Sequence, residues 1–175
     1  MTCGTHAANN WGELADWTAI EPETVFTIDD VELTPFTVPH DAAEPVQFVF
    51  SDGAMRLGLL TDTGMITTHI IEQLSGLDAL LLECNHDTTL LQDSEYPPSL
   101  KQRVGGDYGH LNNSQAADLL RKIKRTDLQH VVAMHLSQQN NKPQLAQQAL
   151  AQSLDCAIEE IFVADQLLGL DWLTI

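Results

Sequence analysis

Three polar residues stand at the ends of predicted strands, and their side chains are of the kind that bind metal ions. His40 follows the stretch TVP, Asp62 ends the stretch LGLLTD, and His135 ends the stretch HVVAMH. Strand ends at one edge of a sheet converge in space, and loops there commonly carry function. Two imidazoles and a carboxylate suit Zn, Mn or Fe. Each residue alone is also explained as a turn or surface residue, so the predicted metal site rests on all three.

Three more residues are candidates for a direct part in catalysis: His110, His86 and Glu83. His110 lies in the segment GGDYGHLNN, just before a predicted helix that Asn113 or Ser114 caps. Backbone N–H groups at such a helix start favour an anion, so His110 is predicted to act as a general acid or to contact a phosphate. The alternative is an ordinary loop histidine.

Glu83 and His86 come at the end of the apolar run LDALLLECN. A carboxylate at the end of a buried strand needs a polar partner. Glu83 is therefore predicted to orient a metal-bound histidine, with a surface loop position as the alternative. His86 directly follows the run. It is predicted either to take part in catalysis or to have a structural role.

The elements that must position these residues form an antiparallel β region followed by β-α-β-α-β. The segments 24–40 and 46–62 each predict two strands, joined at Asp29-Asp30 and Asp52-Gly53. Two apolar runs, 77–85 and 128–137, predict strands buried on both faces. This pattern indicates a single domain over residues 1–175, with helices packed outside its sheets. The remaining expectations are a loop and short helix over 1–20, helices over 63–76, 114–124 and 142–154, a loop over 99–113, and one or two short strands over 158–175.

Charge is unevenly distributed along the chain. Its 175 residues are 43% hydrophobic and carry a formal net charge of −17, which argues against a general nucleic-acid coat or a binder of anionic membranes. Six of the eight basic residues nevertheless fall within 101–125. They are explained either as solvated helix faces or as a local attraction for an anionic ligand.

Three separated cysteines, at positions 3, 84 and 156, form no disulfide framework and no CxxC zinc motif. They favour a reducing, cytoplasmic compartment. No apolar stretch approaches the ~20 residues that span a bilayer, so no membrane association is expected. Residues 1–20 carry neither the basic nor the apolar region of a signal peptide.

Five short motifs, in order along the chain, resemble the metallo-β-lactamase superfamily: TVPHDA, LTDTG, LLLECNHD, GHLNNSQAA and AMHLSQQNN. The resemblance covers about residues 1–155 and is greatest to the YycJ/VicX-like group of bacterial metal-dependent hydrolases. The segment GHLNN, the alanine-containing helix after it and the strand ending in His-Leu-Ser also resemble RNase Z. The resemblance implies an α/β (α+β) fold, the αββα sandwich.

The resemblance also implies roles. His40 matches an isolated histidine ligand, Asp62 the carboxylate that bridges two metals, and His135 the last histidine ligand. His110 matches the histidine of a Gly-His-Ser/Thr loop near the scissile phosphate, and Glu83 lies in the equivalent of a His-Glu-Ala-Thr segment. The implied activity is hydrolysis of phosphodiesters, with nucleic-acid ends as substrates, by water that up to two Zn or Mn ions activate. The basic residues of 101–125 would then steer the polyanion.

The chain departs from the family at one motif. The family's Thr-His-x-His-x-Asp-His cluster does not occur in it, and CGTHAANNW resembles the stretch that follows that cluster. We therefore expect a fold incomplete at its N-terminus, one weak metal site or none, and an open sheet that a homodimer would cover. Two other functions stay open: a non-catalytic scaffold, and a hydrolase of small esters or thioesters.

Overall fold

Alternating apolar residues and two tight turns build the first half of a sheet in the computed structural model, which describes residues 18–124 and 126–175. Strands β1 (Phe26–Ile28), β2 (Val31–Thr37), β3 (Val46–Ser51) and β4 (Arg56–Leu60) pair antiparallel in sequence order. Asp52 Oδ1 accepts hydrogen bonds from the backbone N–H groups of Ala54 and Met55, which fixes the second turn. Both predicted hairpins are therefore confirmed.

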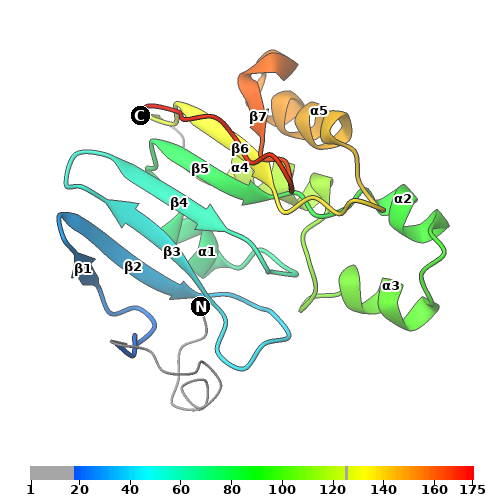
Figure 1. Ribbon diagram of the computed structural model, residues 1–175, viewed down its shortest axis with the longest axis horizontal. Coiled ribbons are helices and arrows are strands. Elements are labelled where there is room, and N and C mark those ends of the chain that lie inside the picture. Colours follow the sequence, from blue (N-terminus) through cyan, green and yellow to red (C-terminus); the bar gives the residue numbers. More distant parts are fainter. Residues whose placement is uncertain (1–17, 125) are drawn as a thin grey trace.

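Apolar strands extend this sheet in parallel. Strands β5 (Ala79–Glu83), β6 (His130–Met134) and β7 (Ile161–Val163) follow β4, which gives a seven-stranded sheet in the order β1 to β7. Because β4 to β7 run in the same direction, their carboxyl ends share one edge of the sheet (Figure 1). We call this edge, with the loops that follow β2, β4, β5 and β6, the site edge.

Three helices cover one face of the sheet: α1 (Thr68–Gln73), α4 (Asn113–Lys122) and α5 (Pro143–Leu154). Their apolar side chains, among them Ile70, Leu120 and Leu150, form one buried cluster with Leu80 and Leu82 of β5. The mixed α/β class that was predicted is confirmed: the described residues form one sheet and one helical layer (Figure 1).

The opposite face of the sheet, which we call the outer face, carries apolar side chains of every central strand, including Phe48, Leu57, Leu81 and Val132. No helix of the described part packs there. The C-terminal segment 170–175 lies over part of this face and borders with it an open hollow of ≈ 360 Å³. The His130 ring and the backbone oxygen of Thr174, 3.0 Å apart, hold the segment in place.

The structure differs from the predicted elements mainly between β5 and α4. Residues 99–113, predicted as a loop, include most of α3 (Pro98–Val104), and α2 (Thr88–Asp93) precedes it. The prediction was wrong because α3 buries no residue and therefore shows no apolar periodicity. Asn112, rather than Asn113 or Ser114, caps α4, through a capping box with Gln115.

Three other expectations have different outcomes. Helix α1 is shorter than the predicted 63–76 because Thr67 caps it by accepting a hydrogen bond from the Ile70 N–H group. The helix expected within residues 1–20 lies almost entirely outside the described residues. Within the described residues, no helix has the length and apolar character needed to cross a membrane.

Candidate metal centre

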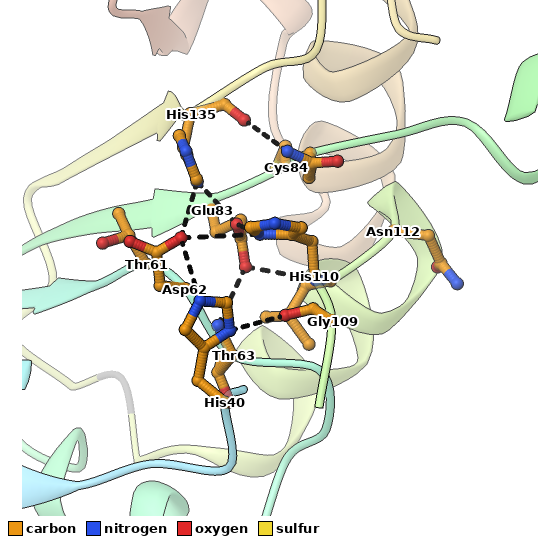
Figure 2. A network of polar contacts seen from close by, with 12 residues as sticks. His40, Thr61, Asp62, Thr63, Glu83, Cys84, Gly109, His110, Asn112 and His135 are labelled. Carbon is orange, nitrogen blue, oxygen red and sulfur yellow. Dashed lines mark hydrogen bonds and ion pairs between the residues drawn. The ribbon is translucent and has the colours of Figure 1, made fainter. Parts of the chain in front are cut away.

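Five residues from the loops and strand ends of the site edge come together in one cluster (Figure 2). His40 follows β2, Asp62 follows β4, Glu83 ends β5, and His135 follows β6. His110 comes from the glycine-containing loop between α3 and α4. The sequence thus predicted correctly that the ends of distant strands converge, because β2, β4, β5 and β6 all end on this edge.

The Asp62 carboxylate lies at the centre of three imidazole rings. Its Oδ1 atom is 3.7 Å from His40 Nε2, 3.6 Å from His110 Nδ1 and 3.8 Å from His135 Nδ1. These separations exceed hydrogen-bond length, so the carboxylate faces the three rings without being hydrogen-bonded to them. One potential ligand atom from each of four residues also lies within 4.8 Å of the others: Asp62, Glu83, His110 and His135. The donor set therefore fits a divalent metal ion.

Glu83 is the buried anion beneath the histidines. Its Oε1 atom accepts hydrogen bonds from His110 Nδ1 at 2.8 Å and from His135 Nδ1 at 2.7 Å. Its Oε2 atom accepts from the backbone N–H groups of Thr63 and Leu111. Burial alone would raise the pKa of this carboxyl, but the hydrogen bonds and positive charge of the two histidines leave its pKa below the usual value.

Glu83 also fixes which nitrogen of each ring is free. Since a carboxylate only accepts, the Nδ1 atoms of His110 and His135 carry the protons, and the Nε2 atoms keep lone pairs for other ligands. The hydrogen bond to Glu83 raises the pKa of His135, although burial acts in the opposite direction. In the same way His40 Nδ1 donates to the carbonyl oxygen of Gly109 at 3.1 Å, and this leaves His40 Nε2 free toward Asp62.

Two of the cluster residues have unusual backbone conformations. Asp62 has φ = 51° and His135 has φ = 56°, both in the left-handed region. A residue with a side chain adopts this region at a cost on the order of 1 kcal/mol, and such residues gather at functional sites. Each bend lies within two residues of a strand end and changes the direction of the chain at the residue that enters the cluster.

Glycines allow the loops of the site to pack closely. A Cβ atom on Gly109 would lie 2.1 Å from the Arg103 carbonyl oxygen, and one on Gly64 would lie 2.4 Å from the Gly106 carbonyl oxygen. An ion pair between Asp41 and Arg103, at 2.5 Å, ties the His40 loop to α3. The loops that carry His40, Asp62 and His110 are therefore fastened to one another independently of any ligand.

His86 lies outside the cluster that the other five residues form. Its side chain is 2% exposed and its Nδ1 atom has no hydrogen-bond partner among the described residues. Burial lowers the pKa of this ring and favours its neutral form. The structure gives His86 no contact with the metal-binding atoms, and a part in catalysis stays a prediction.

The basic residues of 101–125 do not form one patch in the described part. Lys101 and Arg103 lie on α3 beside the site, where Lys101 binds the Gln92 carbonyl oxygen and Arg103 binds Asp41. Arg121 and Lys122 lie in the last turn of α4, about 13 Å from the capped end near His110. Arg121 is paired with Asp118 there. Of these four residues, the two of α3 are therefore the ones that lie beside the site.

Several hydrogen bonds that hold the site residues in place could not be predicted from the residue types. The backbone groups of Gly109, Thr63 and Leu111 hold the side chains in place. Asn85 donates from its side chain to the backbone oxygen of His135, 3.1 Å away. A backbone contact leaves no trace in residue type, although the paired glycines of GGDYGH indicated a loop with close backbone approaches.

Comparison with known proteins gives concordant matches. The family model of the beta-lactamase superfamily domain matches residues 4–136. An exodeoxyribonuclease YycJ of Bacillus anthracis is 36% identical over 131 residues, which are 75% of this chain and 50% of that protein. The chain therefore spans about half the length of this curated relative.

Two solved structures show the same fold. The metallo-beta-lactamase fold protein YhfI from Bacillus subtilis matches with a TM-score of 0.66 at 17% identity, over 89% of this chain and 54% of that one. Zn(2+)-bound PqqB from Methylobacterium extorquens matches with a TM-score of 0.60 at 20% identity, over 89% of this chain and 55% of that one.

Proposed function

The chain belongs to the beta-lactamase superfamily, and we propose that it is the metal-binding part of a hydrolase that cleaves phosphodiesters. The observation that carries the proposal is that the Asp62 carboxylate and the rings of His40, His110 and His135 come together above the buried Glu83. The relative named as an exodeoxyribonuclease supports DNA as the substrate class. We expect Zn or Mn as the metal, because imidazole and carboxylate ligands suit both ions.

His40, Asp62 and His135 would hold the ion, with water completing its coordination. When bound, such an ion lowers the pKa of a water molecule and stabilises negative charge on phosphoryl oxygens. Glu83 keeps the His135 ring in one orientation and one tautomer through the bond to Nδ1. His40 has the same kind of support from the Gly109 carbonyl oxygen.

His110 would handle the proton of the leaving group. Its Nδ1 atom is bonded to Glu83, so its Nε2 atom is the one that exchanges a proton with the oxygen of the breaking P–O bond. The hydrogen bond from Nδ1 to Glu83 holds the ring in this orientation. Two tasks are thus divided within the site. His110 would transfer the proton, whereas His40, Asp62 and His135 would bind the ion.

The test is metal content by elemental analysis after dialysis against Zn or Mn, together with hydrolysis of bis(p-nitrophenyl) phosphate. We expect retained metal that Asp62→Ala removes, and turnover that His110→Ala lowers by about 10² to 10⁴ while metal is kept. Absence of metal in the unsubstituted chain would overturn the proposal. Equal loss of metal and turnover in His110→Ala would move His110 into the ligand set.

A second candidate function is a non-catalytic scaffold that associates through its sheet. The outer face favours it, since Leu57 and Leu81 are covered only in part, by the C-terminal segment. A homodimer that buries this face would be detected as a doubled mass in light scattering. The first candidate concerns the site edge and the second concerns the outer face, so the two measurements are independent.

A further inference from the structure

A second hollow adjoins the candidate metal centre and has a different chemical character. It has a volume of ≈ 400 Å³, and His110 and His135 form one wall. The size falls in the range of about 300–1,000 Å³ that is usual for small-molecule sites. We call it the amide pocket, because the other polar residues that line it are uncharged and five of them carry side-chain amides: Asn85, Gln138, Gln139, Asn140 and Gln166.

The amide pocket has free hydrogen-bonding groups. The side chains of Gln138, Gln139 and Gln166 and the phenol of Tyr96 make no hydrogen bond within the described residues. A ligand that brings donors and acceptors to these glutamine amides and to the phenol would therefore find groups ready to bond.

The pocket lacks the features that would hold a charged or purely apolar group. The ionisable residues of its lining are His110, His135 and Tyr96. The lining therefore contains no lysine or arginine that would bind a phosphate group. Arg103, on the neighbouring helix, is already paired with Asp41. The amide side chains would leave their hydrogen bonds unmet against an acyl chain. A planar neutral group with several donors and acceptors meets both requirements.

We propose that the amide pocket binds the nucleoside on one side of the phosphodiester that the metal centre cleaves. Amide side chains pair with the donors and acceptors of base edges, and tyrosine rings stack on bases. With His110 and His135 on the shared wall, a base in the pocket brings the adjoining phosphate to the cluster. The inference deepens the proposed phosphodiesterase function and rests on it for the identity of the ligand.

The test compares two probes that share the sugar phosphate and differ in the base. Thymidine 5′-monophosphate and 2-deoxyribose 5-phosphate are titrated into the full chain by calorimetry, in EDTA so that metal plays no part. We expect the nucleotide to bind at least about tenfold more tightly, as base–aromatic stacking predicts. Equal affinity for the two probes would overturn the proposal.

Two tyrosines, Tyr96 and Tyr108, give a matched control, since the chain contains no others. Tyr96→Ala should remove most of the preference for the nucleotide, and Tyr96→Phe should keep it. Tyr108→Ala, on an exposed loop residue outside the pocket, should leave it unchanged. Gln138→Ala provides a second variant at an exposed position and should weaken nucleotide binding several-fold. Full nucleotide affinity in both Tyr96→Ala and Gln138→Ala would contradict the assignment.

Failure of this inference can be told from failure of the proposed function. Metal-dependent hydrolysis of methyl p-nitrophenyl phosphate, which has no base, reports on the metal centre alone. Hydrolysis without preference for the nucleotide overturns the nucleoside site and leaves the hydrolase standing. Preference for the nucleotide without hydrolysis supports the site and counts against the hydrolase.

Discussion

The site edge and the outer face belong to the same sheet but differ in the chemistry of their side chains. At the site edge, polar groups are paired with one another, and Glu83 alone has four partners. On the outer face the side chains are apolar and the cover is a thin segment in which Trp172 is fully exposed. The edge is thus organised by directional contacts within the chain, whereas the face offers apolar area. The comparison teaches that the geometry of the metal centre does not depend on what covers the outer face.

The largest effect is expected when the buried carboxylate of the site edge, Glu83, is removed. Glu83→Ala leaves two backbone N–H groups and two imidazoles without their partner. We expect the free energy of unfolding to fall by about 3 kcal/mol and metal binding to be lost. Urea denaturation and elemental analysis measure the two effects. A stability loss below about 1 kcal/mol would show that the network does not organise the edge.

A methyl group on Gly109 tests the close packing of the site loops. The added carbon would lie 2.1 Å from a backbone oxygen that cannot move aside cheaply. We expect Gly109→Ala to cost about 2 kcal/mol and to weaken metal binding, because the Gly109 carbonyl oxygen holds His40. Gly105→Ala, in the same loop but with its nearest atom at 3.3 Å, is the control and should cost clearly less.

Relief of backbone strain should separate stability from metal binding. Asp62 is in the left-handed region that glycine adopts freely, so Asp62→Gly should raise the free energy of unfolding by about 1 kcal/mol, measured in EDTA. The same variant should retain no metal. Asp29→Gly, with φ = 51° in the turn between β1 and β2, should stabilise comparably and keep the metal. A destabilised Asp62→Gly chain would mean that the Asp62 side chain supports the fold.

The smallest effect is expected on the outer face. Trp172, in the C-terminal segment over this face, is 101% exposed, so Trp172→Ser should alter the free energy of unfolding by less than about 0.5 kcal/mol and leave metal binding intact. Light scattering on the same samples tests association. A dimer in the unsubstituted chain that dissociates in the Trp172→Ser variant would show that a second copy uses this face.

The sequence predicted the strands well because their signal is local. Alternation in 24–40 and 46–62 and the apolar runs near Leu80 and Val131 reflect the burial that each strand reaches. The start of helix α5 was predicted to within one residue, because Pro143 suits the first turn of a helix. Helix α3 was not, because an exposed helix has no apolar stripe to reveal it.

The residue types of the site and their places after strands were also determined by the sequence. His40, Asp62, Glu83 and His135 could be singled out because each is a polar residue at the end of a predicted strand. His110 was indicated by its place just before a predicted helix and then by the family motif. The tertiary structure alone decided that one carboxylate oxygen faces three rings, that Glu83 is buried and selects the free nitrogens, and that His86 lies apart. The physical reason is that strand register and left-handed backbone bends set these distances, and both arise only when segments far apart in the chain pack together.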